Sequence, residues 1–115
     1  MVTIYHNPRC QKSREALKML EEKGVEHKVR LYMKDEESMS MDEFEQVLEA
    51  LDMDAEDLVR VKESLWKEEF KELELDEDEI ILAMIEHPKL MERPIIMNGN
   101  KAIIARPAEK MEEVL

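Results

Sequence analysis

Residues 2–32, VTIYHNPRCQKSREALKMLEEKGVEHKVRLY, contain the pattern that decides the fold. The short apolar run at 2–5 favours a strand, and the polar turn formed by residues 6–8 ends it. From residue 11 to 23 the apolar side chains recur near helical spacing. Residues 25–32 then favour a second strand. Strand, helix and strand in this order predict a βαβ unit in which the two strands run parallel.

The middle of the chain predicts a helical insertion at about residues 40–88. Ser40 and Glu43 are spaced as a capping box, in which each side chain bonds the backbone N–H of the other residue. Three further helix signals, the second of them weaker, follow at residues 54–60, 65–73 and 76–87. Pro88 closes the last of these helices, because proline cannot continue a helix.

The end of the chain changes back to strand patterns. The apolar runs at 95–97 and 102–104 flank Asn98-Gly99, the strongest short signal for a hairpin, and predict two antiparallel strands. Pro107 suits the first position of a last helix. The order β-α-β, helices, β-β-α predicts an α/β protein with a four-stranded mixed sheet, which is a thioredoxin-like layout. We expect one such domain over residues 1–115.

Charge and composition restrict the function. The net charge is −12, but residues 1–34 carry 8 basic and 4 acidic side chains, whereas residues 35–92 carry 5 and 22. Phosphate binding needs clustered lysine and arginine, so we expect neither nucleic acid nor a membrane as partner. No apolar run approaches the roughly 18 residues of a membrane span. The single cysteine excludes an internal disulfide and a metal site built on paired cysteines, which favours the reducing cytoplasm.

Cys10, the only cysteine, stands between the first predicted strand and the first predicted helix. Unpaired N–H groups and the helix dipole favour negative charge at this position, and basic neighbours lower the pKa of a thiol from about 8.5. A hydrogen bond from the Ser13 hydroxyl and the nearby His6 would also favour the charged form. The pattern therefore predicts a reactive thiolate. A lone cysteine can also be a small core residue, but the basic surroundings of Cys10 favour the reactive thiol. On the residues alone, His6 and Ser13 could equally be an ordinary loop residue and an ordinary helix residue.

The run at 6–14, HNPRCQKSR, resembles the active-site loop of the glutaredoxin-coupled arsenate reductase family. Three further segments resemble motifs of that family in the same order, namely Asp57-Leu58-Val59-Arg60, residues 86–96 (EHPKLMERPII) and Arg106-Pro107-Ala108-Glu109. The resemblance covers essentially the whole chain. One departure is Asp52, which stands where many members have a glycine.

The resemblance implies roles for the residues that match. These are the nucleophile Cys10, the thiolate-activating His6 and Ser13, the oxyanion-binding arginines Arg60, Arg93 and Arg106, and Pro94, which matches a proline with a cis peptide bond. The planar fork of arginine suits a tetrahedral oxyanion. Without an anion, however, the same arginines could equally form surface ion pairs.

The expected function is reduction of arsenate, a small oxyanion, by attack of the Cys10 thiolate. Because the chain has no second cysteine, we expect glutathione as co-substrate and a glutaredoxin as partner, with no bound cofactor or metal. One alternative is a non-catalytic regulator or adaptor that binds a protein partner, as in the redox-sensing transcription regulators of the family, although Ser13 removes the second cysteine of a disulfide switch. Another is a general glutathione-dependent thiol transferase, for which three oxyanion-binding arginines would be superfluous.

Overall fold

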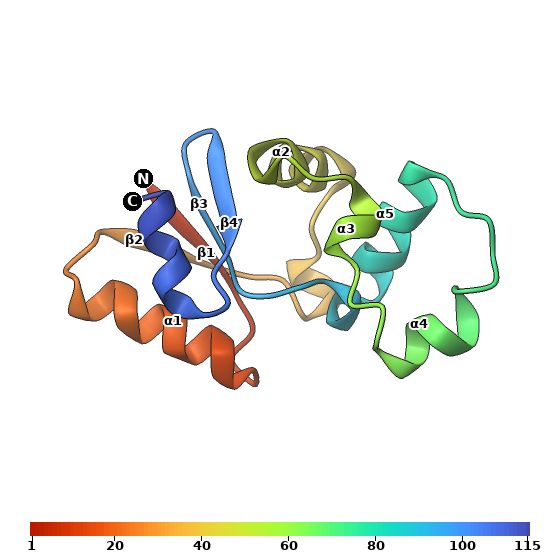
Figure 1. Ribbon diagram of the computed structural model, residues 1–115, viewed down its shortest axis with the longest axis horizontal. Helices are drawn as coiled ribbons and strands as arrows, with labels where there is room; N and C mark the ends of the chain where they lie inside the picture. The colour runs from red at the N-terminus through yellow and green to blue at the C-terminus, as the bar shows by residue number, and fades with distance from the viewer.

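A computed structural model describes residues 1–115 and shows a four-stranded sheet with helices on both faces (Figure 1). The elements in chain order, with η for a 3-10 helix, are β1 Val2–His6, α1 Gln11–Glu22, β2 His27–Leu31, η1 Asp35–Glu37, α2 Met41–Leu51, α3 Ala55–Leu58, α4 Ser64–Glu69, α5 Glu77–Glu86, η2 Pro88–Leu90, β3 Ile95–Asn98, β4 Lys101–Ile104 and η3 Ala108–Glu113. This order confirms the predicted βαβ unit, helical insertion and β-β-α end.

The sheet has the strand order β2-β1-β3-β4. β1 runs parallel to β2 and antiparallel to β3, and β3 pairs antiparallel with β4. The structure therefore confirms the mixed, thioredoxin-like sheet. Because His6 pairs with Leu31, the carboxyl ends of β1 and β2 lie at the same edge of the sheet. The loop that carries Cys10 follows β1 at this edge.

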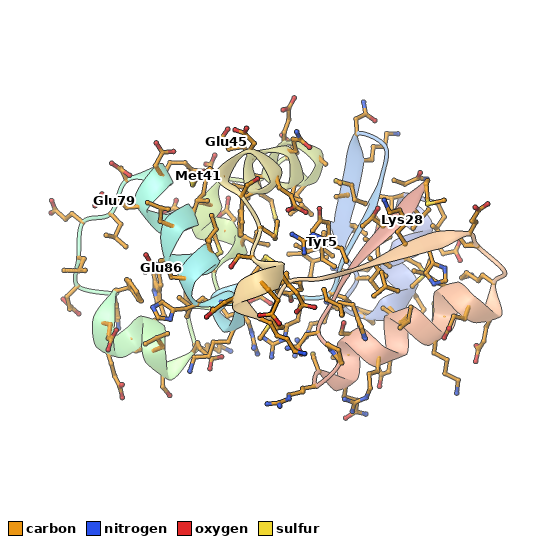
Figure 2. All side chains as sticks on the ribbon, turned by 180° about the vertical axis from the view of Figure 1, so that it is seen from behind. Tyr5, Lys28, Met41, Glu45, Glu79 and Glu86 are labelled. Carbon is orange, nitrogen blue, oxygen red and sulfur yellow. The ribbon has the colours of Figure 1, made fainter.

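The two faces of the sheet bury two separate apolar cores. Ile4 of β1 packs in a core with residues of α1 and η3, whereas the next residue, Tyr5, packs in the larger core that the insertion shares. Figure 2 shows Tyr5 on the side of the sheet that faces the insertion, and Glu45, Glu79 and Glu86 on the outer surface of the insertion. The acidic side chains of the insertion thus form a solvated face. No helix is long and apolar enough to span a membrane.

A half-buried carboxylate fastens the insertion to the sheet. Glu43 of α2 accepts hydrogen bonds from Arg30 of β2, at 2.8 and 3.0 Å, and from the Tyr5 hydroxyl, at 3.0 Å. Burial raises the pKa of Glu43, but the hydrogen bonds from Arg30 and Tyr5 outweigh it and hold the pKa below the usual carboxyl value. Glu43 is therefore an ionised link between β1, β2 and α2.

β2, which spans His27–Leu31, and α4 are both shorter than predicted. β2 is an edge strand, and two of the apolar side chains that indicated it, Val29 and Leu31, are 45% and 37% exposed. The aromatic residue after the strand, Tyr32, is instead buried, at 2% exposure. The weak helix signal at residues 65–73 corresponds to α4, which ends at Glu69.

Two residues have positive φ angles that bear on the sequence analysis. Asn98 pairs with Lys101, so the hairpin loop consists of Gly99 and Asn100 rather than of Asn98 and Gly99, and Gly99 has φ 64°. Asp52 ends α2 in the left-handed conformation, with φ 57° and ψ 48°. Glycine adopts this conformation without the steric cost that a side chain brings, which explains a glycine preference at this place.

Two other helices also differ from the prediction. The last is a 3-10 helix, and Pro107 precedes it in an extended conformation rather than beginning it. The helix predicted at residues 54–60 ends at Leu58, because the next residue, Val59, forms an antiparallel bridge with Met91. This bridge brings the segment that carries Arg60 beside the segment that leads to Arg93.

Candidate active site

Backbone hydrogen bonds fix the Cys10 loop at the start of α1. The Cys10 N–H donates to the Asn7 carbonyl at 3.0 Å, and the Cys10 carbonyl accepts from the N–H of Arg14 at 3.0 Å. The Asn7 side chain closes the turn by accepting from the N–H of Arg9, also at 3.0 Å. Cys10 is thus the last extended residue before the helix and is only 9% exposed.

The surroundings of Cys10 favour its thiolate. Burial raises the pKa of the Cys10 thiol, but a hydrogen bond and the charge of the Arg93 guanidinium oppose it, as do the backbone N–H groups of Ser13 and Lys12. The net effect holds the pKa of Cys10 below its ordinary value. Helix N-terminus and arginine therefore act together on one sulfur.

His6 and Ser13 form one buried unit with the loop backbone. The Ser13 hydroxyl oxygen lies 2.6 Å from His6 Nδ1 and accepts from the Asn7 N–H at 3.0 Å. Burial, and then the charge of Arg14, lower the pKa of His6, so its ring is neutral near pH 7. The structure gives the Ser13 hydroxyl no hydrogen bond to the sulfur, so that expectation was wrong in its detail. Ser13 acts on the thiolate through its backbone N–H, because its hydroxyl binds the loop.

Of the three arginines, Arg93 lies at the sulfur. Its Nη1 donates to the Lys89 carbonyl at 3.2 Å, while its buried Nε has no hydrogen-bond partner. The Arg93–Pro94 peptide bond is cis and leads directly into β3. A second cis bond, Arg106–Pro107, was not expected from the sequence.

Arg60 and Arg106 line a common hollow of about 350 Å³, together with the side chains of Lys62, Glu63 and Glu92. Arg60 Nη1 lies 3.4 Å from a Glu63 carboxylate oxygen, so the alternative of an ion pair applies in part to Arg60. Arg106 is not among the groups that act on the Cys10 thiol. Arg93 and Arg60 both act on one further side chain, that of Tyr32.

Tyr32 is a residue of this site that the sequence analysis missed. Burial raises the pKa of its hydroxyl, Arg93 and Arg60 lower it, and the Cys10 charge raises it, with burial the largest effect. The hydroxyl therefore lies within reach of the charges of both arginines and of the sulfur. Its place after β2, at the edge where the Cys10 loop begins, was the signal that could have revealed it.

A groove of about 470 Å³ runs beside the active-site loop. Residues 6–9 form one side, and Leu31, Met33, Lys34 and Glu37 form the other. The volume of the groove is large enough for a small peptide. No three His, Cys, Asp or Glu side chains gather in a way that could hold a metal ion.

The fold and the thiolate define a class of protein, that of thioredoxin-like proteins with a single cysteine at the start of the first helix. Within this class, residues 5–114 match the family model of ArsC, and the chain belongs to the ArsC family.

Relatives match over nearly the whole chain. An uncharacterized protein of Escherichia coli, YfgD, is 46% identical over 99% of this chain and 96% of its own length. An arsenate reductase of Haemophilus influenzae is 40% identical over 99% of this chain and 98% of its own. The solved structure of an arsenate reductase from Vibrio cholerae has a TM-score of 0.91 at 40% identity and covers 99% of this chain and 97% of that one. These matches confirm the predicted family and fold.

Proposed function

We propose that this protein is an arsenate reductase that takes its electrons from glutathione and a glutaredoxin. The observation that carries the proposal is the setting of Cys10, the only thiol, whose pKa is held below its ordinary value by Arg93 and the start of α1. Relatives that are 40% identical over almost their full length bear the name arsenate reductase, which supports arsenate as the substrate.

The reaction begins with attack of the Cys10 thiolate on arsenic. A sulfur–arsenic bond forms, and an arsenic–oxygen bond breaks, with the oxygen leaving as water. The thiol of glutathione then supplies the second sulfur of a disulfide with Cys10. The glutathione sulfur attacks the Cys10 sulfur, the sulfur–arsenic bond breaks with its electron pair going to arsenic, arsenite leaves, and a disulfide joins Cys10 to glutathione. A glutaredoxin thiol exchanges into this disulfide and returns Cys10 to its reduced form.

The arginines supply the positive charge for this reaction in a protein of net charge −12. In the proposal, Arg93 stabilises first the thiolate and then the adduct, because its guanidinium lies at the sulfur. Arg60 and Arg106, which share a hollow, bind the oxygens of the anion through their planar forks.

The groove beside the loop supports glutathione as the electron donor. Its cations Arg9 and Lys34 take part in none of the ion pairs of the structure, and Glu37 adds one carboxylate. Glutathione carries two carboxylates and one ammonium group, so its charges match those of the groove. The reducing cytoplasm is where such a donor is kept available.

A coupled assay tests the proposal. NADPH oxidation is followed with glutathione reductase, glutathione, glutaredoxin and arsenate, for the wild type and for Cys10→Ser. We expect arsenate-dependent oxidation in the wild type and only the background rate in the variant. Equal rates in the two proteins would exclude the reductase and favour a protein that acts by binding a partner through its acidic insertion.

A further inference from the structure

The Tyr32 hydroxyl is a buried donor without an acceptor. The side chain is 2% exposed, and the hydroxyl has no hydrogen-bond partner in the protein. Buried polar groups in proteins are almost always hydrogen-bonded, because an unmet bond costs free energy. The other tyrosine, Tyr5, follows this rule, since its hydroxyl donates to Glu43 at 3.0 Å. Of the two tyrosines, only Tyr32 has a hydroxyl without a hydrogen-bond partner.

The position of this hydroxyl connects it to the reaction. Tyr32 follows β2 at the edge of the sheet where the Cys10 loop begins, and its hydroxyl is close enough to Cys10, Arg93 and Arg60 for their charges to act on it. Burial keeps the hydroxyl protonated, so that it is a donor. The buried Nε of Arg93 is a second donor without a partner. Two unmet donors near one thiolate are what an anion with several oxygens would satisfy.

We propose that Tyr32 contacts the substrate, and that its hydroxyl donates a hydrogen bond to an oxygen of the oxyanion held between Cys10, Arg93 and Arg60. This inference rests on the proposed function and adds a neutral donor to its three arginines. The hydroxyl makes no hydrogen bond to the sulfur, because it has no hydrogen-bond partner anywhere in the protein. The role of Tyr32 therefore begins when the anion binds.

The test compares Tyr32→Phe with the matched control Tyr5→Phe, which removes a hydroxyl whose bond the protein itself satisfies. Alkylation of Cys10 by iodoacetamide is measured without reductant at increasing arsenate concentrations, and the protection gives the affinity for the anion. We expect Tyr32→Phe to weaken arsenate binding about ten- to a hundredfold, the effect of one hydrogen bond to a charged group. Its alkylation profile against pH without arsenate should not change. Tyr5→Phe should keep the arsenate affinity.

Thermal unfolding separates a functional role from a structural one. Tyr32→Phe should unfold at or above the wild-type temperature, because it removes an unmet polar group, whereas Tyr5→Phe should unfold at a lower temperature. The wild type gives an independent reading. Protein with labelled tyrosine has two ring signals, one for each tyrosine, and arsenate should move the signal of Tyr32 and leave that of Tyr5.

Three outcomes would overturn the inference. Equal arsenate affinity in the wild type and in Tyr32→Phe would mean that the hydroxyl does not contact the anion. A changed alkylation profile with unchanged arsenate affinity would place its effect on the sulfur instead. If arsenate does not protect the wild-type Cys10 at all, the oxyanion site of the proposed function fails together with the role of Tyr32.

Discussion

Replacing Arg93 by alanine should make Cys10 a weaker thiolate. Arg93 is the strongest influence that lowers the pKa of Cys10, through both a hydrogen bond and its charge, and it opposes the effect of burial. A hydrogen bond to a charged group contributes about 1.5–3 kcal/mol. Since 1.4 kcal/mol corresponds to a factor of ten, the thiolate fraction below the midpoint should fall roughly ten- to a hundredfold.

The assay is the rate of alkylation by iodoacetamide as a function of pH. Iodoacetamide is uncharged, so the rate reports the thiolate rather than attraction of the reagent. The pH midpoint of the alkylation rate should be higher in Arg93→Ala than in the wild type. In Arg93→Lys, which keeps the charge but loses the planar fork, the midpoint should lie between those of the wild type and Arg93→Ala. Arg9→Ala is the matched control, because Arg9 adjoins Cys10 in the chain but is exposed and does not shift its pKa.

Two results would refute this reasoning. Coincident profiles for the wild type and Arg93→Ala would mean that the N–H groups of α1 alone hold the thiolate. An equal rise of the midpoint in Arg9→Ala would mean that any nearby positive charge has the same effect, whatever its contact with the sulfur. Far-ultraviolet circular dichroism and thermal unfolding of each variant would show that the fold is kept.

Further predictions concern the anion, the electron donor and the stability. Arg60→Ala and Arg106→Ala should each lower kcat/KM for arsenate about ten- to a hundredfold without changing the alkylation rate of the free enzyme; normal arsenate kinetics would make that arginine structural. Arg9→Ala and Lys34→Ala should raise the KM for glutathione several-fold at saturating arsenate and leave the KM for arsenate unchanged, which initial-rate kinetics would check. Glu43 has a lowered pKa, so its contribution to stability is present above the usual carboxyl pKa and is lost as the pH falls through the lowered value. Glu43→Gln should therefore cost about 1–2 kcal/mol near neutral pH, with the loss shrinking in acid, as measured by urea unfolding at several pH values; a constant difference at all pH values would contradict it.

The fold was largely predictable because its elements carry strong local signals. The βαβ unit follows from apolar periodicity, and Ser40 was correctly placed before α2, where its hydroxyl accepts from the Glu43 N–H. The other half of the predicted capping box does not form, because the Glu43 carboxylate binds Arg30 and Tyr5 instead. The differences arise where long-range pairing decides the conformation. Val59 leaves the helical pattern because it pairs with Met91, and the hairpin loop shifts by one residue because the ladder aligns Asn98 with Lys101. No local pattern contains that information.

The candidate site was predictable only where local sequence signals determine it. Cys10 was identified from its place between a strand and a helix, but its strongest partner, Arg93, is distant in the sequence and was found only through the family resemblance. The hydroxyl of Ser13 was assigned to the sulfur, whereas the fold turns it to the loop and to His6. Tyr32 was missed, because its place after β2 was a weak signal and its unmet hydrogen bond is visible only in the packed structure.

The two apolar cores on opposite faces of the sheet suggest how the site would respond to partial opening of the chain. Cys10 belongs to the loop before α1, on the side of the smaller core, whereas Arg60 depends on the larger core that the insertion completes. If the two cores open as separate cooperative units, hydrogen exchange would show amides of the insertion exchanging by an opening that leaves α1 protected. During such an opening the thiol would keep its helix N-terminus while Arg60 leaves the site. The molecule would then behave for a moment as a simple thiol protein, without the means to select an oxyanion.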